Sequence, residues 1–271
     1  MRADTAVVSP LADRTAGSQE AAARIAAVLP AHTHYVQLQS GGLEVLLHKP
    51  PSNAETINDT GLDIVTFWRV LRDRPDDLRR ACALTPVSRN EFDTARGGSG
   101  SHIGINDLER ARRVWVRLSQ SADGPARIRP EWRGIRRRRQ HTDIEVLAQR
   151  MKDITLECLP AVKVVEALGG HRGVCFYADL RANLYGAQGA DPGAAFRPGP
   201  DVLLSALAKT KAAVVVRVDH TEVEMRPPPG WAQAALTVQA GHPVLLWSNR
   251  PPPIQQPLFD VAAATVGKGT P

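Results

Sequence analysis

The chain has 271 residues, 43% of them apolar, which suffices for one large α/β domain with or without a smaller inserted subdomain. Its net charge of +6 and pI of about 9.6 fit a polyanionic partner without requiring one. No apolar run could span a bilayer, and the N-terminus lacks the segments of a secretory signal. The three scattered cysteines lack metal-ligand spacing, so we expect a cytoplasmic protein with reduced thiols, no metal and no membrane contact.

The first part of the chain has the pattern of a nucleotide-binding α/β unit. In chain order, its elements are a helix over 18–29, a strand over 35–38, a glycine turn at 41–42, a helix over 43–47, a strand over 54–57 and a helix from about residue 63. Ser18 is expected to cap the first helix, and Pro30 to end it. Asn58-Asp59 follows the second strand, and an acid at that point is typical of such a unit.

Residues 85–140 interrupt this alternation, and we interpret them as an inserted, mostly helical subdomain. Thr85-Pro86 is expected to start a helical piece, and a helix from about Asp107 carries apolar residues at helical spacing. The pattern then resumes with helices over 143–151, 162–168 and 201–208 and strands over 155–158, 174–178, 212–218 and 245–248. The sequence therefore predicts an α/β domain formed by residues 1–84 and 141–271, with residues 85–140 inserted.

Six segments, taken in order, carry the pattern of one known family. They are residues 29–59, 67–73, 84–89, 109–115, 176–179 and 244–251. These segments resemble the adenine-specific DNA methyltransferases of the Dam type, and the resemblance extends over residues 18–252. It implies a doubly wound, mostly parallel sheet that binds S-adenosyl-L-methionine (SAM), a helical target-recognition insert, and methylation of adenine on its exocyclic amine.

The positions that hold the cofactor in this family are only partly retained. The family's Gly-Gly-Lys turn corresponds to Ala16-Gly17-Ser18, so Gly17 remains and the cation is lost. Gln37-Leu38-Gln39-Ser40-Gly41-Gly42 stands where the family has Glu-Pro-Phe-Ala-Gly-Gly. Gly41 and Gly42 allow a tight turn beside a ligand, or they only connect strand to helix. Asp59 matches the acid that bonds ribose hydroxyls, although aspartate also suits a simple turn. SAM is therefore expected to bind weakly or not at all.

The turn that would hold the target base has changed most. In the family, Asp-Pro-Pro-Tyr holds the adenine amine with the aspartate, fixes the turn with the prolines and stacks the flipped base on the tyrosine. Here the four residues are Asp179-Leu180-Arg181-Ala182, and only Asp179 remains. Stacking on an aromatic ring is worth roughly 1–3 kcal/mol, and a misplacement of about 1 Å can cost around a hundredfold in rate. Arg217-Val218 also departs from the family's Leu-Ser-Gly-Tyr.

An arginine-rich segment of the inserted region is the candidate DNA contact. It comprises Trp132, Arg133, Arg136, Arg137, Arg138 and Arg139. Arginine binds phosphate as a bidentate donor, and a tryptophan ring can stack on a base. The alternative is a solvated charged loop.

Retained segments with diverged functional positions favour a degenerate methyltransferase with little or no methyl transfer. Such a protein would bind DNA or a protein partner, for example an active methyltransferase. Two alternatives are kept. One is an active SAM-dependent adenine methyltransferase with divergent motifs, in which Asp179 is essential. The other is an enzyme that uses the same pocket for a different substrate.

Overall fold

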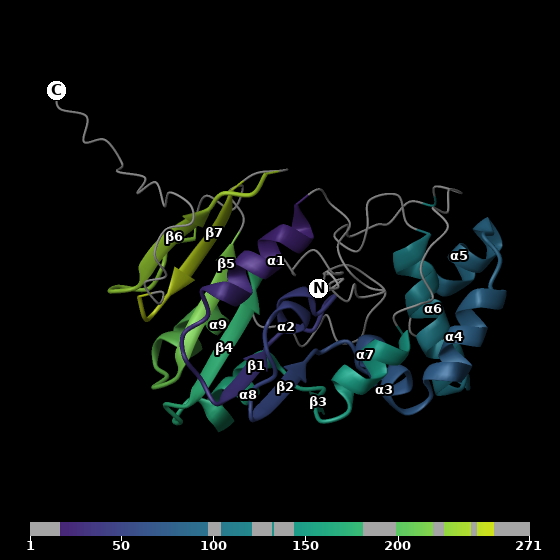
Figure 1. Ribbon diagram of the computed structural model, residues 1–271, viewed down its shortest axis with the longest axis horizontal. Helices are drawn as coiled ribbons and strands as arrows, with labels where there is room; N and C mark the ends of the chain where they lie inside the picture. Colours follow the sequence, from purple (N-terminus) through teal and green to yellow (C-terminus); the bar gives the residue numbers. More distant parts are fainter. Residues whose placement is uncertain are drawn as a thin grey trace, which may run out of the picture.

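A computed structural model describes residues 17–96, 104–120, 132, 144–180, 199–218, 225–239 and 243–251. Within these residues, helices cover both faces of a central sheet, and a further group of helices lies beside the sheet (Figure 1).

The sheet that these residues form has seven strands in the order β3-β2-β1-β4-β5-β7-β6 (Figure 1). The strands are β1 (His34–Gln37), β2 (Ala54–Asn58), β3 (Thr155–Glu157), β4 (Val174–Asp179), β5 (Ala213–Val218), β6 (Ala232–Leu236) and β7 (Val244–Ser248). β1 to β5 pair in parallel, whereas β7 runs antiparallel to both β5 and β6. The predicted fold class, an α/β fold with a mostly parallel sheet, is therefore confirmed.

Alternating side chains divide the two faces of the sheet between two apolar cores. In β4, Cys175 and Tyr177 face one core, while Phe176 and Ala178 face the other. Nearly every residue of β4 and β5 is buried, as expected for central parallel strands that are covered on both sides. This pattern explains why these strands are read as continuous apolar runs in the sequence.

The helices that cover the sheet are divided between the two cores. The core of Tyr35 and Tyr177 includes α1 (Ser18–Ala27), α2 (Glu44–His48), α3 (Leu62–Asp73) and α7 (Ile144–Met151). The core of Phe176 includes α8 (Ala161–Leu168) and α9 (Pro200–Ala208). Cover on both faces is the doubly wound arrangement that was expected. Among the described helices, none is both long and apolar enough to cross a bilayer.

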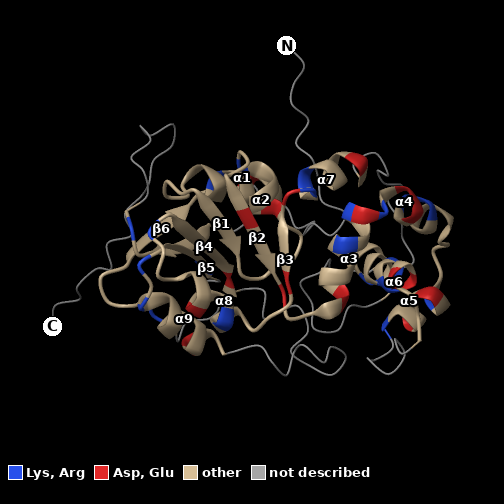
Figure 2. Cartoon of the chain, turned by 90° about the horizontal axis from the view of Figure 1, so that it is seen from below, with Lys and Arg blue, Asp and Glu red and all other residues tan. Residues whose placement is uncertain are grey.

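A group of helices lies beyond α3 and α7, beside the β3 edge of the sheet (Figures 1 and 2). It consists of α4 (Pro75–Leu84), α5 (Arg89–Arg96) and α6 (Asp107–Ser119). Ala111 and Val114 of α6 join the same core as Trp68 of α3, so this group continues the core of the sheet. Charged residues of both signs lie on α4, α5 and α6, whereas the sheet is mostly uncharged (Figure 2). The predicted division at residues 84 and 141 stays a prediction.

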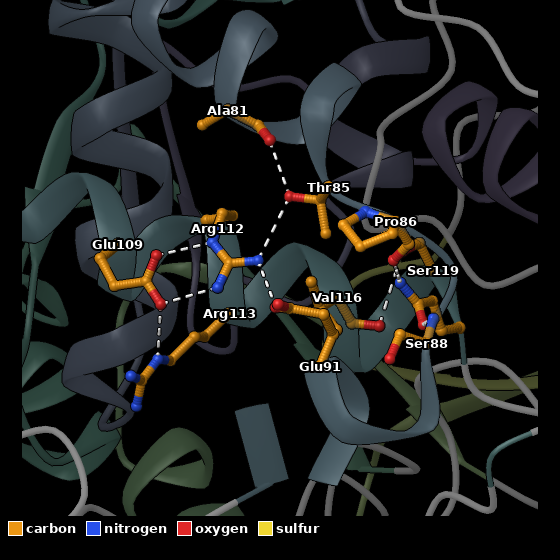
Figure 3. A network of polar contacts seen from close by, with 11 residues as sticks. Ala81, Thr85, Pro86, Ser88, Glu91, Glu109, Arg112, Arg113, Val116 and Ser119 are labelled. Carbon is orange, nitrogen blue, oxygen red and sulfur yellow. Dashed lines mark hydrogen bonds and ion pairs between the residues drawn. The ribbon is translucent and has the colours of Figure 1, made fainter. Parts of the chain in front are cut away.

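A network of charged side chains joins α5, α6 and the connection before α5 (Figure 3). The Arg112 Nε and Nη2 atoms donate to the two carboxylate oxygens of Glu109, at 2.6 and 2.8 Å. Its Nη1 donates to Glu91 at 2.7 Å and to the Thr85 hydroxyl at 3.2 Å. Glu109 also accepts a hydrogen bond from Arg113 at 2.8 Å. Arg112 and Arg113 of α6 are therefore committed to carboxylates of the same helical group.

Three details differ from the sequence-based expectations. Gly17, not Ser18, occupies the N-cap of α1, and its φ of 84° favours glycine. The helix ends at Ala27, before Pro30. Thr85-Pro86 does not start a helix, because a residue before proline is driven out of the helical region, and α5 begins at Arg89. Helix α4 and strand β6 were not predicted.

Candidate functional site

The topology places a ligand-binding edge at the carboxyl ends of β1 and β4. The chain runs outward from β1 to β2 and β3 in one direction and from β4 to β5 in the other. Ligands of open α/β sheets bind where the strand order reverses in this way, outside the carboxyl ends of the strands. The residues that follow β1 and end β4 include the predicted Gly41, Gly42 and Asp179. The fold therefore brings these predicted residues to one edge.

The turn after β1 is held together by its own side chains. Gln37 donates from Nε2 to the carbonyl oxygens of Gln39 at 3.0 Å and Ser40 at 2.8 Å. Its Oε1 accepts from the Tyr35 hydroxyl at 3.1 Å. Gly41 has a φ of 48°, a conformation that favours glycine. The side-chain amide of Gln37 thus stabilises this turn from within the protein.

Asp59 joins the ends of β1 and β2. Its Oδ2 accepts from the Ser40 backbone N–H at 3.2 Å and from the Ser40 hydroxyl at 3.0 Å. Its Oδ1 accepts from the Gly61 N–H at 2.9 Å, and the residue is only 6% exposed. The acid that matches the ribose-binding position therefore orders two turns of the protein. This is the turn role that the sequence had left open beside the cofactor role.

Asn58 extends the same arrangement to β3. Its Nδ2 donates to the carbonyl oxygens of Leu38 at 3.1 Å and Leu159 at 3.0 Å, and its Oδ1 accepts from the Leu159 N–H at 3.0 Å. A buried side-chain amide thus ties together the connections that follow three neighbouring strands, β1, β2 and β3. Sequence reasoning had treated Asn58 only as the neighbour of Asp59.

Asp179 ends β4 and lies beside an arginine. Its backbone N–H donates to Gln39 Oε1 at 3.2 Å, which links the ends of β1 and β4. Its carboxylate lies 3.9 Å from Nη1 of Arg217, the residue that is its register partner on β5. Leu180, which stands where the family has its first proline, is 2% exposed and packs into the core of α8 and α9. Asp179, the residue predicted to be catalytic, therefore lies in an ion pair.

Gly17 lies at the same carboxyl edge of the sheet. It starts α1, and Glu20 in the first turn of α1 accepts from the Gln239 N–H at 2.8 Å. Gln239 follows β6, which is parallel to β5 because both are antiparallel to β7. The N-terminal end of α1 therefore lies at the carboxyl edge of the sheet.

Trp132 packs within the helical group. Its ring contacts the small core of Phe92, Ala95 and Val116, and the Arg89 guanidinium lies 4.7 Å from the ring centre. One face of the ring is therefore covered by a cation of the same chain. The other members of the predicted DNA contact, Arg133, Arg136, Arg137, Arg138 and Arg139, lie outside the described residues.

Arg217 and Gln39 are site residues that sequence reasoning did not assign. Arg217 was noted only as a departure from the family pattern. A signal was present, because Asp179 and Arg217 are charged residues at or near the ends of apolar runs that predict buried strands. Within the described ranges, no group of three or more His, Cys, Asp or Glu residues is arranged to hold a metal ion.

These features define a doubly wound α/β protein whose ligand edge is crossed by its own hydrogen bonds. No known family and no curated protein matches the chain. Among solved structures, the yhhF protein of Escherichia coli, provisionally described as a methyltransferase, is 13% identical, with 88% of this chain and 89% of that chain covered at a TM-score of 0.38. A methyltransferase from Geobacter sulfurreducens is 10% identical, with 88% and 80% covered at a TM-score of 0.39. The likeness concerns the type of fold alone.

Proposed function

We propose that this chain is a degenerate homologue of the SAM-dependent adenine-specific DNA methyltransferases, impaired in methyl transfer, which binds DNA or a protein partner. The observation that supports it is the environment of Asp179. In active members of that family, the corresponding carboxylate accepts hydrogen bonds from the adenine amine. Here it faces Arg217 at 3.9 Å, and the turn that follows begins with a buried leucine in place of a rigid proline.

The residues at the carboxyl edge of the sheet argue against tight SAM binding. In the family's pattern, Asp59 would bond the ribose and residue 37 would be an acid. Asp59 already accepts hydrogen bonds from Ser40 and Gly61, and Gln37 donates to the turn itself. When bound, SAM would supply an activated methyl group on a sulfonium. The residues of this chain would have to give up internal hydrogen bonds to hold it, and that cost opposes binding.

Methyl transfer is tested directly with DNA, the purified protein and SAM carrying a labelled methyl group. The proposal expects no label in adenine above that of a protein-free control, under conditions in which an active adenine methyltransferase labels the same DNA. Label in adenine that disappears in Asp179→Ala would instead establish the active enzyme with divergent motifs.

DNA binding is tested separately through its dependence on salt. We expect the affinity for duplex DNA to fall as salt rises, because the bound arginines release counterions from the phosphates. Replacing Arg136, Arg137, Arg138 and Arg139 by glutamine should reduce the slope of log K against log salt by about one for each phosphate that the variant no longer binds.

A matched control separates the arginine-rich segment from net charge. Replacing Arg69, Arg74, Arg79 and Arg80 by glutamine removes the same number of positive charges, here from α3, α4 and the residue between them. This control should leave the slope nearly unchanged, because most of these arginines pair with neighbouring acids. Equal effects of the two sets would show that the segment is not the DNA-binding surface.

A further inference from the structure

Arg217 is a nearly enclosed cation whose hydrogen-bonding capacity is not met by the described residues. Its side chain is 12% exposed, and the carboxylate oxygen of Asp179 lies 3.9 Å from Nη1, which is too far for a hydrogen bond. Its Nε is buried and has no hydrogen-bond partner within the described part of the chain. Buried polar groups are normally hydrogen-bonded, and a desolvated guanidinium is costly without good partners.

The neighbours of Arg217 in the sheet explain this poor pairing. In the ladder, its register partner on β4 is Asp179, and its register partner on β7 is Leu246. On its own strand, the preceding residue on the same face is Val215, which belongs to the apolar core. Within the sheet, the guanidinium thus has a carboxylate on one side and apolar side chains on two others.

A second unsatisfied donor lies on the same face and at the same edge. Gln19 belongs to the first turn of α1, and its buried Nε2 has no hydrogen-bond partner among the residues that the structure describes. Helix α1 packs on this face through Ala21 and Ile25, in the core that also contains Val215. Its N-terminal end lies at the carboxyl edge, as the bond between Glu20 and Gln239 indicates. Both unsatisfied groups donate, so the partner that each needs is an acceptor.

We propose that Arg217 anchors a binding site for a small oxyanion, the carboxylate or phosphate group of a ligand, at the carboxyl ends of β4 and β5. Guanidinium groups recognise carboxylate and phosphate through paired, charge-assisted hydrogen bonds. The carboxyl edge of a doubly wound sheet is where such ligands bind. Gln19 adds a neutral donor on the α1 side. This proposal goes beyond the proposed function and holds whether or not methyl transfer is retained.

In this site, the Asp179 carboxylate competes with the ligand for the Arg217 guanidinium. It neutralises Arg217 in the ligand-free protein, and it repels an entering anion. Removal of its charge should therefore strengthen anion binding, whereas removal of the Arg217 charge should abolish it. A purely structural ion pair predicts no gain of anion affinity in either variant.

The test uses acetate and inorganic phosphate as probes, titrated against the full chain at constant ionic strength with chloride as the reference anion. Binding is followed by the rise in Tm, which linkage relates to ligand affinity. We expect acetate, phosphate or both to raise Tm in the wild type, and their comparison distinguishes a carboxylate site from a phosphate site. Arg217→Met should lose this rise, and Asp179→Asn should bind the same anion about tenfold more tightly.

The control and a second variant keep the test decisive. Arg250 donates to the Lys211 carbonyl at the opposite edge of the sheet, so Arg250→Met should retain the wild-type response. If circular dichroism shows that Arg217→Met does not fold, Arg217→Lys, which keeps the charge but not the planar fork, should bind the anion more weakly than the wild type. The proposal is overturned if neither anion raises Tm, if Arg217→Met responds like the wild type, or if Asp179→Asn binds the anion no more tightly than the wild type.

Discussion

Asp59 was predicted to bind a cofactor, but its carboxylate is hydrogen-bonded within the fold. Because its hydrogen bonds to Ser40 and Gly61 are buried, Asp59→Ala should leave backbone donors without acceptors. We expect the ligand-free protein to lose about 2 kcal/mol or more of unfolding free energy. Urea unfolding measures this.

Asp201 provides the control for Asp59. It is an exposed acid in the first turn of α9, so Asp201→Ala should cost about 0.3–1 kcal/mol. If Asp59 served only to bind a ligand, its replacement would not lower the stability of the ligand-free protein, and the structural role assigned to it would be wrong.

The cysteines offer a second test at the residue scale. Cys82 and Cys175 are buried, and burial raises the pKa of each thiol to about 12, whereas Cys158 is exposed. The thiolate is the reactive form, so the buried thiols should be inert in the folded protein. Titration with a thiol reagent at pH 8 should modify only Cys158, and all three should react in denaturant. Fast modification of Cys82 or Cys175 without denaturant would contradict this burial.

Residue-scale features were the least predictable from the sequence. The sequence identifies Asp59, Gly41 and Asp179, but it does not tell whether a carboxylate is available to a ligand. That depends on partners distant in the sequence, such as Ser40 for the Asp59 carboxylate and Arg217 for the Asp179 carboxylate. Such pairings follow from strand order, which local patterns do not contain.

At the scale of elements, Arg112 stabilises the helical group by joining α5 and α6. It is 17% exposed and bonds Glu91, Glu109 and Thr85 (Figure 3). Arg112→Met should therefore lower the unfolding free energy by roughly 2–3 kcal/mol, because the carboxylates lose a charged, partly buried donor. The control Arg69→Met removes an exposed pair with Asp107 and should cost about 0–1 kcal/mol. Equal losses in urea unfolding would contradict the assignment.

The same network predicts how this stability depends on pH. The hydrogen bond from Arg112 is the main cause that holds the pKa of Glu109 below its ordinary value of 4.5. A depressed carboxyl pKa contributes stability that is fully present above the unfolded value and is lost as the pH falls through the folded value. The destabilisation caused by Glu109→Gln should therefore be largest near pH 7 and shrink below about pH 4.5. A difference that stays constant from pH 7 to pH 3 would refute this.

Most elements could be predicted from periodicity, and the two that were missed have physical reasons. β6 has the sequence Ala-Gln-Ala-Ala-Leu, which lacks β-branched residues and clear alternation, so its strand is formed by pairing with β7. α4 begins at Pro75 and follows α3 with only Arg74 between them. Its first two residues, Pro75-Asp76, are typical of a helix start, but they are not followed by the large apolar residues at helical spacing that mark α3.

At the scale of the whole molecule, the predicted α/β class follows from the order of apolar runs, and the sheet confirms it. The glycines and acids that the sequence singled out, Gly41, Gly42, Asp59 and Asp179, lie at the carboxyl edge of this sheet. The order of apolar runs does not reveal the hydrogen bonds at this edge. These bonds involve the side chains of Gln37, Gln39, Asn58 and Asp59. These bonds occupy the groups that a cofactor would need.

Calorimetric titration of SAM into the ligand-free protein tests this claim most directly. Our account predicts no binding heat, or a Kd weaker than about 1 mM, which corresponds to only about 4 kcal/mol of binding free energy. A Kd in the low micromolar range that is lost in Asp59→Ala would contradict it, because Asp59 would then hold the cofactor and not only the turns of the protein.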